Sequence, residues 1–233
     1  MGLSTFATAA AALLIAGALP CAAHASEISG EVDLLELHVG KGSDHLVMES
    51  TFAFGKGADQ FVLKVDGGSD ARTAFDSVQV QALYSRALSD KVAVLVGARR
   101  DFRAGADLNY AALGIEASLT DWLDVEHYVY LSEHNDLTGA GKVTARWALG
   151  KRLALEPRVM LNWSARAVPA EALGAGVNDF EGSVRLRRAI GPHADLYVGY
   201  AHEHLFGQTR RIAVAAGQAP IINRAIVGMG LKF

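Results

Sequence analysis

Apolar and polar residues alternate with a period of two through most of this chain, in segments of about ten residues separated by turn signals. Between residues 59 and 66, for example, Phe61, Leu63 and Val65 occupy one phase and polar residues occupy the other. The expected strands lie near Glu31, His45, Asp59, Asp76, Lys91, Leu108, Trp122, Lys142, Leu153, Asp179, Ala194 and Asn223. Successive side chains of a strand point to opposite faces, so the pattern predicts an all-β fold of about twelve strands, each with one apolar and one polar face.

The connections between these segments are expected to alternate between short and long. Short turns are expected at residues 55–58, 89–90, 120–121, 150–152 and 191–193, and longer loops at 67–75, 103–107, 132–141, 167–178 and 206–222. Outer-membrane barrels sort their connections in this way, with short turns on one side of the membrane and longer loops on the other. The alternation therefore favours a transmembrane antiparallel up-and-down β-barrel over a soluble β-sandwich.

The last segment supports closure of such a barrel, whereas the first segment is the weakest prediction. Near the C-terminus, Val227, Met229, Leu231 and Phe233 share one phase, and the chain stops on the aromatic residue. This ending resembles the C-terminal signal of outer-membrane barrels. Unpaired backbone groups are costly in lipid, so we expect the last strand to pair with the first. The first segment, residues 32–39, does not alternate cleanly.

Part of the apolar character of the chain, whose mean hydropathy is +0.18, lies in an uncharged N-terminal segment. We interpret residues 1–25 as a secretory signal peptide cleaved after Ala25, although it lacks the basic residues that usually begin such a segment, and residues 26–233 as the barrel. The one cysteine of the chain, Cys21, lies in this signal, and Pro20 before it disfavours a lipid anchor. The mature chain is then expected to have neither a disulfide nor a thiolate metal site.

Charged residues are nearly balanced, with 22 Lys and Arg against 25 Asp and Glu and a formal net charge of −3. This balance lacks the basic footprint of a nucleic-acid-binding protein, so no nucleic-acid partner is expected. If the apolar faces contact lipid, the polar faces line the lumen, with Glu49, Lys64, Asp66, Gln79, Gln81, Arg99, Glu116, Asp124, Glu126, Lys142, Arg146, Arg166, Arg185, Arg187 and Glu203. Two interpretations stay open: these charges pair across a narrow or plugged lumen, or they line a selective conduit for small ions.

Histidine side chains supply the candidate metal ligands, because imidazole is a common ligand for copper, zinc and nickel. His202 and His204 fall on one face of a strand, about 7 Å apart along it, near its extracellular end. His45 and Met48, close to a rim loop, form a second candidate group. For both groups the alternative is a polar rim that binds no metal. The remaining candidates are expected to be interfacial or solvated rather than ligating: His127, His134 and His193.

Motifs of catalytic sites are absent from the sequence, which has no G-x-S-x-G elbow, no H-E-x-x-H helix and no Walker loop. The run Gly139-Ala140-Gly141-Lys142 continues into Val143, where a Walker loop requires Ser or Thr. We therefore expect that the protein is not an enzyme. The alternative is a lipid hydrolase at the rim, with His202 or His204 acting on Ser132.

Several short motifs, in order along the chain, resemble those of one protein family. Gln81-Ala82-Leu83-Tyr84-Ser85-Arg86 resembles a hallmark stretch of the copper resistance protein B family of proteobacterial outer-membrane proteins. Lys64-Val65-Asp66-Gly67 resembles an earlier Lys-Thr-Glu-Gly element, with Thr and Glu replaced. Further matches are Gly97–Phe102, Ala111–Gly114, Arg152–Arg158 with Asn162, Gly174–Gly176, Arg185–Arg187, Tyr197–Gly199 and Phe206–Thr209. The resemblance extends from near Glu31 to Phe233.

The resemblance implies a barrel in the cell outer membrane that is associated with copper tolerance and copper binding, with the copper ion as its ligand. The expected partners of a monomeric barrel are outer-membrane lipid, copper ions and periplasmic copper-resistance proteins. The chain departs from the family pattern because it lacks a Met- and His-rich stretch before the barrel, and its methionines after residue 25 are Met48, Met160 and Met229. We therefore expect weak copper contact through His and carboxylate groups, serving copper export or limited entry. The alternative is a general small-solute channel without metal preference.

Overall fold

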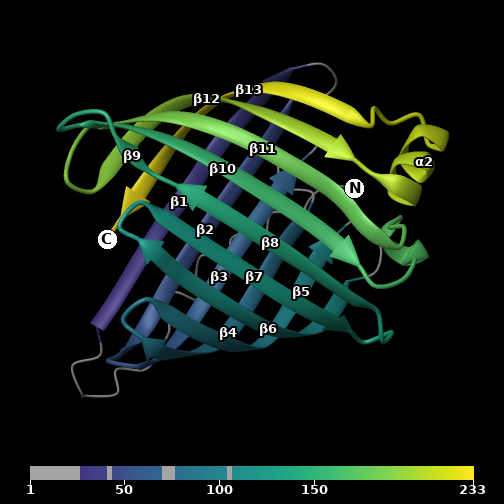
Figure 1. The fold of residues 1–233 in the computed structure, drawn as a ribbon, viewed down its shortest axis with the longest axis horizontal. Coiled ribbons are helices and arrows are strands. Elements are labelled where there is room, and N and C mark those ends of the chain that lie inside the picture. The colour runs from purple at the N-terminus through teal and green to yellow at the C-terminus, as the bar shows by residue number, and fades with distance from the viewer. Residues whose placement is uncertain (1–26, 41–43, 70–76, 104–106) are drawn as a thin grey trace, which may run out of the picture.

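The computed structural model describes residues 27–40, 44–69, 77–103 and 107–233, which form one closed antiparallel β-barrel (Figure 1). The strands are β1 (Glu27–Gly40), β2 (His45–Lys56), β3 (Asp59–Ser69), β4 (Ser77–Ser89), β5 (Val92–Arg103), β6 (Leu108–Thr120), β7 (Leu123–Ser132), β8 (Leu137–Ala145), β9 (Trp147–Ala148), β10 (Leu153–Ser164), β11 (Gly176–Ala189), β12 (Ala194–Leu205) and β13 (Ile221–Lys232). The short β9 continues the line of β8, since both pair with β10, so the wall has 12 strand positions. The predicted fold class is confirmed.

The last strand closes the barrel against the first, as the sequence predicts. β13 pairs with β1 in an antiparallel register. Gly30 and Phe233 exchange two backbone hydrogen bonds, of 2.8 and 2.9 Å, beside the C-terminus. A side chain at Gly30 would clash with the ring of Phe233, so glycine makes room for the terminal aromatic residue. Closure of the barrel satisfies the backbone hydrogen-bonding groups of both end strands, which would otherwise be unpaired in lipid.

A β-bulge explains the irregular alternation of the first strand. The register of β1 shifts after Val32 against both of its neighbours, so that Asp33 is an extra residue. Because of this extra residue, Asp33 borders the lumen while the adjacent Leu34 is also buried inside the barrel. A bulge of this kind re-aims side chains without breaking the pairing of the strand.

The two ends of the barrel differ. The start of β1, the C-terminus and the connections of residues 57–58, 90–91, 121–122, 149–152 and 190–193 lie at one end, which we call the turn end. The opposite end, the loop end, carries the 3-10 helix η1 (Pro169–Glu171) and the helix α2 (Gly207–Ala215) in the connections that follow β10 and β12. Figure 1 shows α2 at the end opposite the C-terminus. Among the described residues, no helix is both long and apolar enough to cross a lipid bilayer.

The connection between β7 and β8 is shorter than the sequence predicts. A loop is expected over residues 132–141, but β8 already begins at Leu137. Ser132 Oγ accepts the backbone N–H groups of His134 at 3.2 Å and Asp136 at 3.0 Å. These hydrogen bonds close a tight turn in place of the expected loop.

Glycine accounts for this error, because Gly139 and Gly141 lie inside β8 rather than in a loop. A Cβ atom at Gly139 would clash with the indole of Trp163, which covers this position from the neighbouring strand. Two further connections at the loop end have only four residues, 41–44 between β1 and β2 and 104–107 between β5 and β6. Strict alternation of short and long connections is therefore wrong at these three places.

The two phases of the strands separate as predicted, with apolar side chains on the outer surface and polar ones inside. Large exposed residues of the outer phase include Val96, Leu113, Val198 and Val227. At the turn end, the rings of Trp122 and Trp147 lie 6.3 Å apart, as expected for the aromatic border of a membrane barrel. The predicted signal peptide at residues 1–25, with Cys21, lies outside the described residues, as do most of the predicted loops at 67–75 and 103–107.

Candidate functional site: the barrel lumen

Ion pairs cross the interior of the barrel and join strands that are far apart in the wall. Lys64 on β3 binds Glu116 on β6 and also Glu126 on β7, the latter at 2.9 Å. Lys142 on β8 lies 3.0 Å from Glu126 and 3.5 Å from Glu49, which belongs to β2. These contacts place cations and anions in alternation through the lumen.

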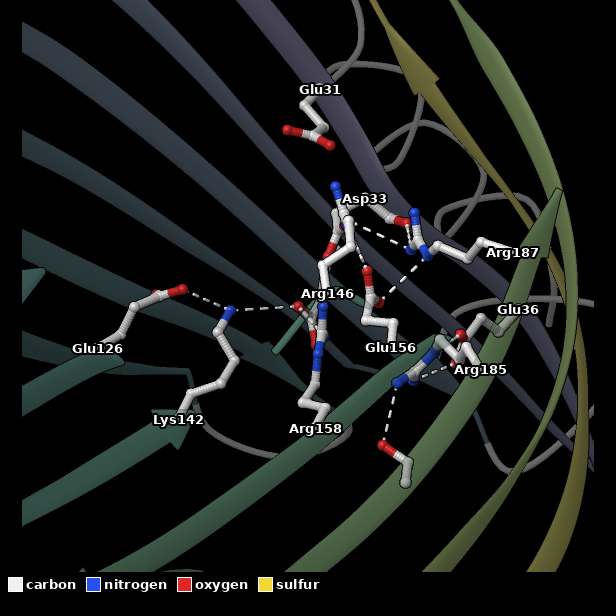
Figure 2. A network of polar contacts seen from close by, with 12 residues as sticks. Glu31, Asp33, Glu36, Glu126, Lys142, Arg146, Glu156, Arg158, Arg185 and Arg187 are labelled. Carbon is white, nitrogen blue, oxygen red and sulfur yellow. Dashed lines mark hydrogen bonds and ion pairs between the residues drawn. The ribbon is translucent and has the colours of Figure 1, made fainter. Parts of the chain in front are cut away.

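Arg158 on β10 extends this series to another part of the wall. It donates to Glu49 at 2.8 Å and binds Asp33 at the bulge of β1. Three strands, β11, β12 and β13, separate β10 from β1, so both contacts span the lumen (Figure 2). We call this series the ion-pair chain, and its members are Lys64, Glu116, Glu126, Lys142, Glu49, Arg158 and Asp33.

A second group of ion pairs is buried beside the wall of β10, β11 and β1. Arg185 binds Glu36 through two guanidinium nitrogens, and its NH2 group lies 3.0 Å from Glu36 Oε2. Glu156 binds Arg146 and lies 3.1 Å from Arg187. The side chains of Glu36 and Glu156 are 0% exposed, and that of Arg185 is 1% exposed. We call these contacts the buried braces. Because buried charges are tolerated only when they are paired, we assign the buried braces a role in holding the wall together.

Three members of the ion-pair chain are partly exposed to solvent, whereas the carboxylates of the buried braces are not. The side chains of Lys142, Glu126 and Glu49 are 24%, 23% and 19% exposed. They border a cavity of ≈ 770 Å³ that extends from Trp122 at the turn end to Glu171 at the loop end. A solute that passed through this cavity would meet these three charged groups.

The wall of this cavity carries more negative than positive side chains, nine against six. The acidic residues are Glu31, Asp33, Glu49, Asp66, Asp121, Asp124, Glu126, Glu171 and Asp179, and the basic residues are Lys64, Arg99, Lys142, Arg146, Arg158 and Lys232. A passage lined by an excess of one sign of charge concentrates ions of the opposite sign. The arrangement can therefore favour cations over anions.

Aromatic rings line the lumen on the side of β6 and β7. The guanidinium carbon of Arg99 lies 4.8 Å from the ring centre of Tyr110 and 4.4 Å from that of Tyr130. Lys64 Nζ lies 4.9 Å from the ring centre of Tyr128. Contacts between cations and ring faces hold these long side chains against the wall. Nearer the turn end, buried apolar residues fill the same side: Val62, Leu83 and Leu95.

The connection between β10 and β11 covers part of the loop end. Glu171 and Leu173 of this connection border the cavity. Gly174 N–H donates to Thr209 Oγ1 of α2 at 2.8 Å, and Ser164 Oγ donates to the carbonyl of Gly174 at 2.8 Å. Helix α2 is therefore tied to this connection, and together they form a cover that is anchored on β10.

The predicted lumen residues face the interior, with one exception. Arg166 lies beyond the end of β10, where its Nε donates to Asp136 at 2.8 Å, so its placement in the lumen is wrong. The predicted set also lacks charged residues that face the lumen, although the alternation of polar and apolar residues places them there. Glu156 and Arg158 fall in the polar phase of β10 and could have been found by alternation. Asp33 could not, because it is the extra residue of the bulge.

His202 and His204 lie near the loop end of β12 and share the outward phase of the exposed Tyr200. Their ring centres are 6.4 Å apart. His202 Nδ1 lies 2.8 Å from Asn223 Oδ1, and the ring of His204 stacks on Phe206 at 4.6 Å. The pair shares one face as predicted, and this face points away from the lumen.

His45 and Met48 point to opposite sides of β2. His45 is the register partner of the buried His38 on the inner face, and Arg224 donates to its Nε2. Met48 lies in the outer phase, because side chains three positions apart on a strand point to opposite faces. These two side chains therefore do not meet at one site. Within residues 27–40, 44–69, 77–103 and 107–233, no group of three or more His, Cys, Asp or Glu side chains has the geometry to hold a metal ion.

The residues of the hydrolase alternative are not brought together. Ser132 is buried in the inner phase at the end of β7, and its Oγ closes the turn to β8. His202 and His204 lie on the outer face of β12. The wall of the barrel separates the hydroxyl from both imidazoles, so no nucleophile and base are paired here.

Comparisons with protein families and curated proteins agree with one another. The family model described as copper resistance protein B precursor (CopB) matches residues 27–233. A copper resistance protein B homolog of Pseudomonas syringae pv. tomato is 28% identical over 202 residues, which are 86% of this chain and 68% of that protein. Copper resistance protein B of Escherichia coli is 26% identical over 195 residues, which are 80% of this chain and 63% of that protein.

Two solved structures that resemble this barrel are porins. The KdgM porin superposes with a TM-score of 0.55 at 15% identity, covering 88% of this chain and 99% of that chain. The NanC porin superposes with a TM-score of 0.56 at 11% identity, covering 89% of this chain and 100% of that chain. At these identities the likeness shows the fold alone.

Proposed function

Because the chain belongs to the copper resistance protein B family, we propose that it acts in copper homeostasis at the outer membrane, as a barrel whose lumen is a narrow conduit for cations. Copper ions are the cargo of this conduit rather than a resident cofactor. They make weak contacts with the carboxylate groups of the cavity wall as they pass. The barrel lowers periplasmic copper, either by exporting the ions or by limiting their entry.

The observation that carries this proposal is the cavity, with nine acidic and six basic side chains on its wall, that runs past the ion-pair chain. Large porins have a wide aqueous lumen, whereas ion pairs from Lys142 and Arg158 divide this one. A charged constriction favours ions of one sign and slows neutral solutes. The lumen is thus suited to small cations rather than to sugars or anions.

Donor groups suited to copper face the lumen without converging on a single site. The carboxylates of Glu49 and Glu126 suit Cu(II), and the thioether of Met160, which lines the same cavity, suits Cu(I). Conduction requires contacts weak enough for the ion to leave each position. Separate donors along the cavity support transient contact rather than sequestration.

Deletion of the gene tests this function in the cell. We expect the deletion strain to lose copper tolerance and to accumulate periplasmic copper, and wild-type protein to restore both. Protein with Glu49→Gln and Glu126→Gln, expressed at the same level, should restore copper tolerance and copper content only in part, because neutral amides replace two carboxylates of the passage. Unchanged tolerance and copper content in the deletion strain would contradict the proposal.

A general small-solute channel is the second candidate function. It is favoured by the dispersed donors, since no three-ligand metal group exists in the part of the chain that the structure describes. A planar-bilayer conductance that copper does not alter, together with normal copper tolerance of the deletion strain, would support this candidate.

A further inference from the structure

The ammonium group of Lys142 lies between two carboxylates, of which Figure 2 labels that of Glu126. Its Nζ is 3.0 Å from Glu126 on the adjacent strand β7 and 3.5 Å from Glu49 on β2. Between β8 and β2 the wall contains β10, β11, β12, β13 and β1. Lys142 therefore completes a bridge of ion pairs across the cavity. A solute that passes through the barrel would have to pass this bridge.

We propose that Lys142 determines the cation selectivity of the lumen, as a tethered cation that occupies the binding position for a passing cation between Glu49 and Glu126. A cation that passes must displace the ammonium group from these carboxylates. Divalent ions do so better than alkali ions, because their attraction to a carboxylate is about twice as strong at equal distance. This inference rests on the proposed function, since it requires that cations pass, and adds the residue that chooses among them.

The two carboxylates have further cationic partners that hold them in place. Lys64 donates to Glu126 at 2.9 Å, and Arg158 donates to Glu49 at 2.8 Å. Lys64 and Arg158 are only 11% and 2% exposed, against 24% for Lys142. Lys64 and Arg158 thus position the carboxylates, and Lys142 is the partner that solvent ions can exchange.

The neighbouring strand adds a soft donor beside this position. Met160 on β10 is the register partner of Lys142 and lines the same cavity. When the ammonium group is displaced, the position offers two carboxylates with a thioether on the adjacent strand. Sulfur donors bind copper and have little affinity for alkali ions, so the selectivity extends to copper over K⁺.

The variant Lys142→Met removes the charge and keeps an unbranched side chain of similar length. Refolded wild-type protein and variants are compared in planar bilayers by K⁺ conductance and by the K⁺/Cl⁻ permeability ratio from reversal potentials. We expect Lys142→Met to raise both about threefold or more, because one positive charge leaves a passage in which charges interact strongly. Lys142→Arg, which keeps the charge, should match wild type, as should Lys151→Met at the exposed connection of the turn end.

Block of the K⁺ current by Cu²⁺ supplies an independent readout. In Lys142→Gln, which adds no thioether, the ammonium group no longer competes for Glu49 and Glu126, so the Cu²⁺ concentration for half block should fall about tenfold relative to wild type, a difference of about 1.4 kcal/mol. With Cu⁺ under reducing conditions, adding Met160→Leu to this variant should raise the concentration for half block, because thioether sulfur prefers Cu⁺. The same Cu²⁺ sensitivity in wild type and Lys142→Gln would contradict a shared position for the ammonium group and the metal ion.

Folding of each variant is checked by the heat-dependent gel mobility of the barrel. A folded Lys142→Met with wild-type conductance and permeability ratio overturns the proposal. Lys142→Gln serves as a second neutral variant, and failure of both to fold also overturns it, because Lys142 would then be a structural brace. Normal copper tolerance of the deletion strain would instead overturn the proposed function, while the bilayer result would stand as a property of a general cation channel.

Discussion

Removing one partner of a buried brace should destabilise the barrel strongly. Arg185 binds Glu36 through two nitrogens and donates to Ser183 Oγ at 3.0 Å. In Arg185→Met the carboxylate of Glu36 would stay buried with two uncharged or titratable neighbours, His38 at 2.7 Å and the hydroxyl of Tyr197, and without its guanidinium partner. Both members of the ion pair are shielded from water, so the loss follows the cost of breaking a buried ion pair, about 3–5 kcal/mol.

Urea unfolding of the refolded barrel in lipid vesicles, followed by tryptophan fluorescence, measures this loss as a free energy of unfolding. The double variant with Glu36→Gln and Arg185→Met should recover much of it, because no unpaired charge is left inside. Arg86→Met removes a partner of Asp59 in a half-exposed pair at the turn end and should change stability little. If Arg185→Met stayed within about 1 kcal/mol of wild type, the value of an ordinary hydrogen bond, our reasoning on the buried braces would be refuted.

Two further variants test the placement of side chains on the outer face. Gly139→Val forces a side chain against Trp163 and should lower the free energy of unfolding by about 1–3 kcal/mol in the urea assay. Gly150→Val is the control, because Gly150 lies in a turn with open space around it. Equal stability of the two variants would contradict the packing of Trp163 over Gly139. Replacing both His202 and His204 by alanine should leave K⁺ conductance unchanged, because both rings lie outside the wall; altered conductance in planar bilayers would place them on the pathway instead.

Alternation predicts which face a side chain takes, because the phase of a residue is a local property of its strand. It therefore identifies Lys64, Lys142 and Glu126 as lumen residues. It does not predict which of them pair, because the partners are distant in sequence, 125 residues apart for Arg158 and Asp33. Which sides of a barrel face each other depends on the number and stagger of all its strands.

Local irregularities of the backbone set the other limit of the sequence analysis. The bulge after Val32 brings both Asp33 and Leu34 inside, and a strict period of two has no place for an extra residue. In β8, Gly139 is typical of a loop by composition, yet its role is to accept the indole of Trp163 from another strand. Such requirements arise from tertiary contacts and are invisible to local patterns.

The central claim is that copper ions cross the barrel along the charged side chains around Lys142. Liposomes that hold the refolded barrel and an enclosed copper-sensitive dye measure this crossing directly, with empty liposomes and a neutral disaccharide as controls. We predict that Cu²⁺ enters through wild type faster than through the variant with Glu49→Gln and Glu126→Gln, while disaccharide entry stays near that of empty liposomes. Copper entry no faster than in empty liposomes, or equal passage of copper and disaccharide through both proteins, would contradict the account.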